Sequence, residues 1–121
     1  MRKDWNMNLY LEYPFGDGAW RDAPTYQQNK DDLELNYARG PAWPSVSKMV
    51  DYYWIESPVG YISLVIECDV EVTSRETFCT QNQFVPYLSA VLKIKYRKEK
   101  IRDWKLIKGD VERFLNERVS F

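Results

Sequence analysis

A run of basic side chains near the C-terminus is the sharpest chemical feature of this sequence. Lys93, Lys95 and Arg97 alternate with apolar residues, and Arg102 and Trp104 follow shortly after. Alternate side chains on a β-strand share one face and lie about 7 Å apart, a spacing similar to that of nucleic-acid phosphates. This basic segment is a candidate binding site for nucleic acid, for a nucleotide phosphate or for an acidic protein.

The same segment also has an ordinary structural interpretation. Tyr96 and Trp104 interleave with the cations, and exposed rings there could stack on the bases of a single strand. In the structural interpretation both rings point into the core and the lysines solubilise an outer face. We favour this second interpretation. The uneven distribution of charge along the chain is the argument for the first. Residues 1–75 carry 12 acids and 7 bases, a net of −5, whereas residues 76–121 carry 6 acids and 10 bases, a net of +4.

Aromatic side chains supply a second candidate surface. The chain has five Trp, nine Tyr and five Phe residues, too many for every ring to fit inside a small core. Trp20, Tyr37 and Trp43 lie among prolines and predicted loops. Surface Trp and Tyr side chains bury much area for little rotamer entropy. We therefore expect these three rings to form an aromatic loop surface that binds a partner.

Catalytic and metal-binding patterns are weak. The chain has no histidine, which excludes Ser-His-Asp and Cys-His arrangements within it. Asp17, Asp22 and the acids of residues 31–34 lack the spacing of a Ca²⁺ or Mg²⁺ site. Two cysteines without histidine cannot supply the four ligands of a structural zinc site. We predict no catalytic residue, no metal and no cofactor, and keep a carboxylate- or metal-dependent enzyme as the minor alternative.

Two further features bear on the cellular compartment. No apolar run approaches the roughly 20 residues of a membrane span, and no apolar segment typical of a secretory signal follows the basic N-terminus. The cytoplasm is therefore predicted, without membrane association. Because thiols stay reduced there, we expect Cys68 and Cys79 to be free.

The length of 121 residues predicts one domain, residues 1–121, with one core. Alternating or β-rich patterns predict most of its elements. Residues 45–56 also fit a helical spacing, but the turn sequence that follows favours a hairpin. The predicted strands are 5–13, 32–37, 45–56, 61–68 and 90–97, with loops at 14–30 and 40–44 and a turn at 57–60.

Two helices complete the predicted fold. Asp110 is expected to cap a C-terminal helix with Val111, Phe114 and Leu115 on one face. Within residues 80–92 we prefer a short helical turn that uses Phe84, Leu88, Val91 and Leu92 and has Pro86 in its first turn, followed by the strand of residues 90–97; a strand is the alternative. The fold class is α+β, with a small antiparallel or mixed sheet of four to five strands packed with a C-terminal helix and one further short helix. An uncovered edge strand at residues 32–37 could pair two copies into a homodimer.

Small size, divided charge and surplus aromatic residues, without a catalytic motif, are typical of an interaction protein. We predict a non-enzymatic protein that binds and inhibits a macromolecular partner, as phage anti-defence proteins and toxin immunity proteins do. A nucleic-acid or nucleotide-phosphate binding module that uses residues 93–108 is the alternative.

Overall fold

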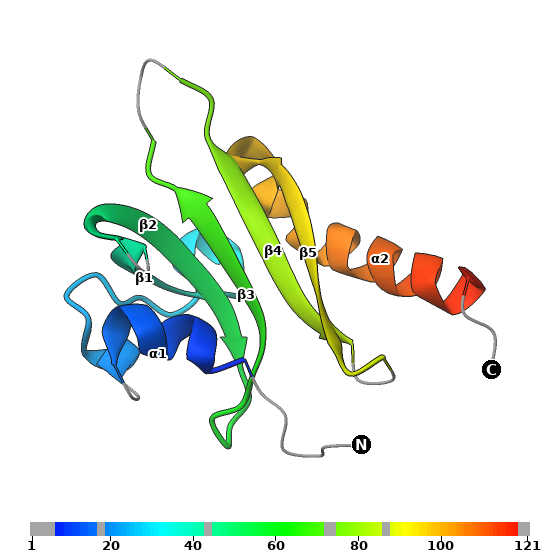
Figure 1. Cartoon of the computed structure of the whole chain (residues 1–121), viewed down its shortest axis with the longest axis horizontal. Helices are drawn as coiled ribbons and strands as arrows, with labels where there is room; N and C mark the ends of the chain where they lie inside the picture. Colours follow the sequence, from blue (N-terminus) through cyan, green and yellow to red (C-terminus); the bar gives the residue numbers. More distant parts are fainter. Residues whose placement is uncertain (1–6, 17–18, 43–44, 72–74, 86–87, 119–121) are drawn as a thin grey trace.

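The computed structural model describes residues 7–16, 19–42, 45–71, 75–85 and 88–118 (Figure 1). Five strands form one antiparallel sheet whose spatial order, β1-β2-β3-β4-β5, follows the chain. A short helix, α1, precedes the sheet and a longer helix, α2, follows it, which confirms the predicted α+β class. The strands are β1 (Asn36–Ala42), β2 (Ser45–Glu56), β3 (Ile62–Asp69), β4 (Phe78–Val85) and β5 (Ala90–Arg97); the helices are α1 (Leu9–Phe15) and α2 (Trp104–Arg118), with 3-10 turns η1 (Ala19–Asp22), η2 (Lys30–Asp32) and η4 (Lys98–Asp103).

The hairpin predicted in the middle of the chain is confirmed. β2 and β3 pair in antiparallel register around a turn at residues 57–60. Gly60 adopts a φ of 91°, which favours glycine, and its N–H donates to the Ser57 carbonyl at 2.9 Å. The strand interpretation of residues 45–56 is therefore correct.

The strand predicted at residues 5–13 is wrong where the structure describes it, because Leu9–Phe15 forms α1. The alternation of apolar residues there also contains a helical spacing. Met7 and Leu11 are four residues apart and both are fully buried. Packing of this one-turn stripe against the sheet decides the conformation, since an isolated helix of this length is unstable in water.

The predicted boundaries of the other early elements also change. β1 begins at Asn36 rather than at residue 32, and it continues through Gly40 and Pro41 to Ala42 instead of ending before them. Pro41 is tolerated because β1 is an edge strand, where a missing donor breaks no inner ladder. Part of the predicted loop at residues 14–30 belongs to α1 and η1.

The helical turn preferred within residues 80–92 is wrong for the part that forms β4, and Pro86 lies outside the described residues. β4 is a strand with buried Gln81, Asn82 and Gln83. The alternation expected for residues 90–97 is confirmed as β5. The C-terminal helix begins at Trp104, six residues before Asp110, so Asp110 lies inside α2 and does not cap it.

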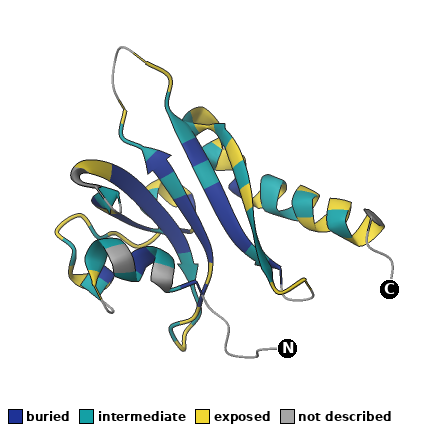
Figure 2. Cartoon of the chain, viewed as in Figure 1, coloured by how far each residue is buried: buried dark blue, intermediate teal, exposed yellow. Residues whose placement is uncertain are grey.

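The sheet has an apolar cluster on each face. On the first, which we call the α1 face, Tyr52 and Trp54 pack with Leu11 and Trp20. On the opposite, Trp104 face, Tyr53, Leu64 and Ile66 pack with Leu33, Leu35 and Trp104. Figure 2 shows buried residues concentrated on the middle strands and exposed positions along β5.

Cys68 and Cys79 form a disulfide between the adjacent strands β3 and β4. The expectation of two free thiols is therefore wrong. The two residues lie directly opposite each other in the antiparallel register, which brings their Cα atoms to 4.0 Å. Cys68 is buried, as expected. None of the helices that the structure describes is long and apolar enough to cross a membrane.

Candidate functional site

Lys93, Lys95 and Arg97 lie in one row on the α1 face of β5, and all three are exposed. Neighbouring groups orient each cation. Lys93 Nζ donates to Asn82 Oδ1 at 2.8 Å, Lys95 Nζ lies 4.9 Å from the centre of the Phe78 ring, and Arg97 pairs with Glu76 at 3.1 Å. The alternation read from the sequence therefore produces a fixed row of cations along one strand, which we call the basic row.

The two rings that interleave with this row point to the Trp104 face, where Trp104 is buried and Tyr96 is partly buried. The Tyr96 hydroxyl donates to Gln81 Oε1 at 2.7 Å, and burial raises the pKa of Tyr96. Trp104 is buried, and its Nε1–H donates to the Leu33 carbonyl at 2.9 Å. Trp104 therefore anchors the start of α2 and offers no face for base stacking, which corrects its place among the candidate binding residues. Arg102, in η4, is exposed.

The aromatic loop surface does not form as expected. Trp20 is buried, and its Nε1–H donates to Glu56 Oε1 at 3.3 Å. Tyr37 is buried beside Tyr53, with ring centres 5.0 Å apart. Trp43 lies outside the described residues. Both described rings fill the clusters on the two faces of the sheet, because α1 and the segment before β1 cover more of the sheet than the sequence predicts.

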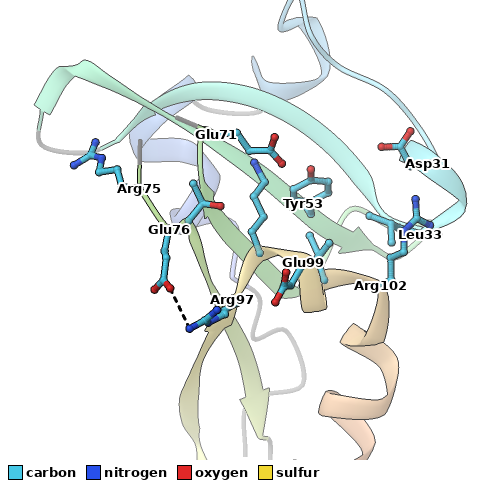
Figure 3. A pocket seen from close by; sticks show the side chains of 12 residues that line it. Asp31, Leu33, Tyr53, Glu71, Arg75, Glu76, Arg97, Glu99 and Arg102 are labelled. Atoms are coloured by element: carbon cyan, nitrogen blue, oxygen red, sulfur yellow. Dashed lines mark ion pairs between the residues drawn. The ribbon is translucent and has the colours of Figure 1, made fainter. Parts of the chain in front are cut away.

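A cleft of about 440 Å³ opens beside the end of β5 that carries Arg97 (Figure 3). Tyr53, Leu33 and Ile101 contribute to its lining. Its charges are balanced, which makes it unlike a simple phosphate site. The basic lining residues are Arg75, Arg97, Lys98 and Arg102, and the acidic ones are Asp31, Glu71, Glu76 and Glu99.

A buried carboxylate lies behind this cleft. Asp51 accepts hydrogen bonds from the Tyr37 hydroxyl at 2.7 Å, from Arg39 Nε at 2.7 Å and from Lys98 Nζ at 3.0 Å. Lys98 Nζ also donates to the Asp69 carbonyl at 2.8 Å. Burial alone would raise the pKa of Asp51, but these donors outweigh it and hold the pKa below its ordinary value. Burial, together with the bond to Asp51, raises the pKa of Tyr37 to about 12.

The Asp51 network joins the edge strand β1 and its neighbour β2 to the residue that follows the other edge strand, β5. Tyr37 and Arg39 belong to β1, Asp51 to β2, and Lys98 follows β5. Lys98 is thereby committed to structure, although it also lines the cleft. We did not predict this network from the sequence. The only signal was one acid inside the β-rich run of residues 50–55.

A second cleft, of about 380 Å³, lies on the α1 face and is lined by Tyr10, Tyr52, Glu67 and Lys95 among others. Burial raises the pKa of Glu67, and this effect is opposed by a hydrogen bond from Asn82 and by the charge of Lys93. Asn82 Nδ2 donates to Glu67 Oε2 at 3.3 Å. A partly buried acid with a raised pKa therefore lies close to the basic row.

The two edges of the sheet are protected differently. On β1, Tyr37 and Gln27 exchange backbone hydrogen bonds at 2.8 and 2.9 Å, and the Arg39 N–H donates to Thr25 Oγ1 at 2.7 Å. The homodimer predicted to form through this edge would therefore have to pair a strand whose outer side is already covered by residues 25–27. On β5, no strand within the described ranges pairs with the outer side. The charge of the basic row is what guards this edge, a common device against unwanted pairing.

No protein-family model, curated protein sequence or solved structure matches this chain. Within the described part of the chain, no group of three or more Cys, Asp or Glu residues is arranged to hold a metal ion. The basic row on the open edge of β5 is the surface that stands out on physical grounds, because exposed backbone groups and oriented cations coincide there.

Proposed function

We propose that this protein is a small, non-enzymatic binding protein that engages an acidic protein partner through the basic row of β5. Its inhibitory action on that partner, of the anti-defence or immunity type, is part of the proposal. One observation carries it: Lys93, Lys95 and Arg97 project from one face of an uncovered edge strand. Such an array steers and orients an acidic surface through complementary charge.

The surroundings of the basic row favour a protein over a nucleic acid. Glu76 pairs with Arg97, and Glu67 lies within the electrostatic reach of Lys93. Such mixed charge suits the alternating polar groups of a protein surface better than a continuous phosphate backbone. Trp104 is buried, and Tyr96 is partly buried with its hydroxyl hydrogen-bonded to Gln81, so neither ring forms the open stacking platform that single-stranded nucleic acid would use.

The compartment remains a prediction. The cytoplasm was expected from the sequence, whereas disulfides such as Cys68–Cys79 persist mainly in oxidising compartments. A binding function through β5 operates in either setting, because the basic row does not include the cysteines.

The test is affinity capture from host lysate with matched charge reversals. The tagged protein is compared with Lys95→Glu/Arg97→Glu, which reverses the basic row, and with Lys48→Glu/Lys100→Glu, which makes the same charge change at exposed residues outside it. All samples are run with and without nuclease and at two salt concentrations. Circular dichroism and thermal melting establish that each variant is folded.

We expect the tagged protein to capture a defined acidic protein, and nuclease treatment should not prevent this capture. The control variant should capture the same protein, whereas the row variant should not. Activity of that partner should fall when the purified protein is added. Nucleic acid that disappears with nuclease and at high salt would favour the alternative binding module. Equal capture by all three proteins would overturn a role for the basic row.

A further inference from the structure

The direction of the backbone groups of β5 follows from the disulfide. In an antiparallel pair, directly opposite residues alternate between wide, hydrogen-bonded pairs and narrow pairs that exchange no backbone bonds. Cys68 and Cys79 are opposite, with Cα atoms only 4.0 Å apart, which identifies a narrow pair. The N–H and C=O of Cys79 therefore point away from β3 and toward Tyr96, its partner on β5.

Two hydrogen bonds support this assignment. The Phe78 N–H donates to Asp69 Oδ2, on the β3 side, at 2.9 Å. The Lys98 N–H donates to the Thr77 carbonyl, on the β4 side, at 3.0 Å. Even-numbered residues from Leu92 to Lys98 thus turn their backbone groups toward β4. The N–H and C=O groups of Lys93 and Lys95 point outward from the sheet.

We infer that β5 receives an extended acidic segment of the partner as a sixth, antiparallel strand. This inference rests on the proposed function and specifies how the partner binds. The outward backbone groups of Lys93 and Lys95 supply main-chain hydrogen bonds, as in other complexes formed by strand addition. Antiparallel pairing matches every existing neighbour in the sheet.

The side chains of the added strand follow from the same register. Directly opposite residues of paired strands point to the same face. Partner residues opposite Lys93 and Lys95 therefore lie on the α1 face, where acidic side chains are favoured. The residues between them lie on the Trp104 face, beside the partly buried Leu92 and Ile94 of β5. A segment that alternates acidic and apolar residues fits both faces.

Helix α2 adds an apolar surface below the open edge. In Figure 1, α2 starts beside η4 and diverges from β5 beyond this edge. Ile107, Val111 and Leu115 lie on the side of the helix that carries the buried Trp104, and they are only partly buried. The apolar residues of an added strand would cover this stripe.

A second copy of this chain is a poor occupant of the same edge. Pairing two β5 strands would bring two basic rows side by side, and like charges on paired strands are destabilising. An acidic segment meets no such repulsion. The chemistry of the edge therefore selects a different chain.

The experiment uses an acetylated heptapeptide of alternating glutamate and valine as the probe. Its affinity for the full chain is measured by isothermal titration calorimetry, together with two N-methylated versions. Methylation of the glutamate amides removes the N–H groups that face Lys93 and Lys95, whereas methylation of the valine amides removes N–H groups that face solvent. The Lys95→Glu/Arg97→Glu variant is measured in parallel.

Loss of two main-chain bonds should weaken binding about tenfold or more for the glutamate-methylated peptide, with little change for the valine-methylated one. Amide hydrogens of Lys93 and Lys95 should exchange more slowly in the complex. Binding could instead be salt-sensitive and lost with the row variant, yet equally strong for both methylated peptides. That result would overturn strand addition and leave the proposed function standing. A peptide that does not bind, or edge amides already protected in the free protein, would also overturn strand addition. Partner capture would then decide the proposed function separately.

Discussion

Replacing Asp51 with asparagine should destabilise the protein strongly. The Asp51 side chain is only 4% exposed, and it balances two cations, of which Lys98 is 13% exposed and Arg39 is 41% exposed. Asparagine keeps the shape but removes the charge, so Lys98, whose side chain is largely buried, loses the carboxylate with which it pairs. Arg39 can recover part of its hydration, which limits its share of the loss.

Removing one partner of a buried ion pair costs about 3–5 kcal/mol, and the exposure of Arg39 places Asp51→Asn near the lower end. For a chain of this length, that loss lowers the melting temperature by about 10 °C. Urea denaturation followed by tryptophan fluorescence at pH 7 measures the free energy directly. Lys98→Met alone, and combined with Asp51→Asn, completes a double-mutant cycle whose coupling energy isolates the pair.

The pH dependence supplies an independent check. The pKa of Asp51 is lowered in the folded protein, so its stabilising contribution is complete above the ordinary Asp pKa and is lost as the pH falls through the folded value. Wild-type protein should lose this contribution in acid, whereas Asp51→Asn should not. A loss of less than about 1 kcal/mol at pH 7, in the range of surface ion pairs, would refute the reasoning.

Three further predictions concern other parts of the fold. Reduction of the cross-strand disulfide, which spans 11 residues, should lower the free energy of unfolding by about 3 kcal/mol; equal urea midpoints with and without reductant would contradict this. Glu67→Gln should stabilise the protein at pH 7, because burial raises the pKa of Glu67 and penalises its ionised form; the difference should shrink as the pH falls toward the ordinary Glu pKa, and melting curves from pH 4 to pH 8 test it. Gly40→Ala should lower stability by about 1–3 kcal/mol, because the added Cβ would lie 2.5 Å from the Phe15 ring. Gly109→Ala, which meets no atom within 4 Å, should instead be neutral or stabilising by up to about 1 kcal/mol, and thermal melting compares the two.

The parts of the fold that the sequence predicted well are those with one unambiguous period. Residues 61–68 are rich in residues that favour strands and follow a glycine turn, and residues 92–97 alternate between apolar or aromatic and basic side chains. Both form the expected strands, β3 and β5. The positions of Lys93, Lys95 and Arg97 on one face follow directly from that alternation.

β4 was not predicted because its buried positions are polar. Gln81 and Asn82 are fully enclosed, and their amides are satisfied by the Trp104 and Val65 carbonyls at 3.2 and 3.1 Å. A hydrophobic pattern cannot reveal a strand whose interior side chains are amides. Those partners lie 23 and 17 residues away in the chain, so the bonds that make burial acceptable are invisible before the fold is known.

The charges of the candidate site were predictable from the sequence, but the positions of its rings and its open edge were not, for a related reason. The charges of the basic row are local properties of one strand. The interior positions of Trp20 and Tyr37 depend on how α1 and the segment before β1 fold over the sheet. The open edge of β5 depends on the strand order, which no local pattern specifies.

The strand order also has a kinetic consequence. Because each strand pairs with the next one along the chain, most of the sheet can assemble hairpin by hairpin, and each hairpin closes only a short loop. Longer closures join the Met7 N–H to the Ile62 carbonyl, Trp104 to Leu33 and Lys93 to Tyr10. We expect the meander to form first and the two terminal helices to dock last. The edge of β5 is then already open during folding, and only its own lysines oppose pairing with other chains at that stage.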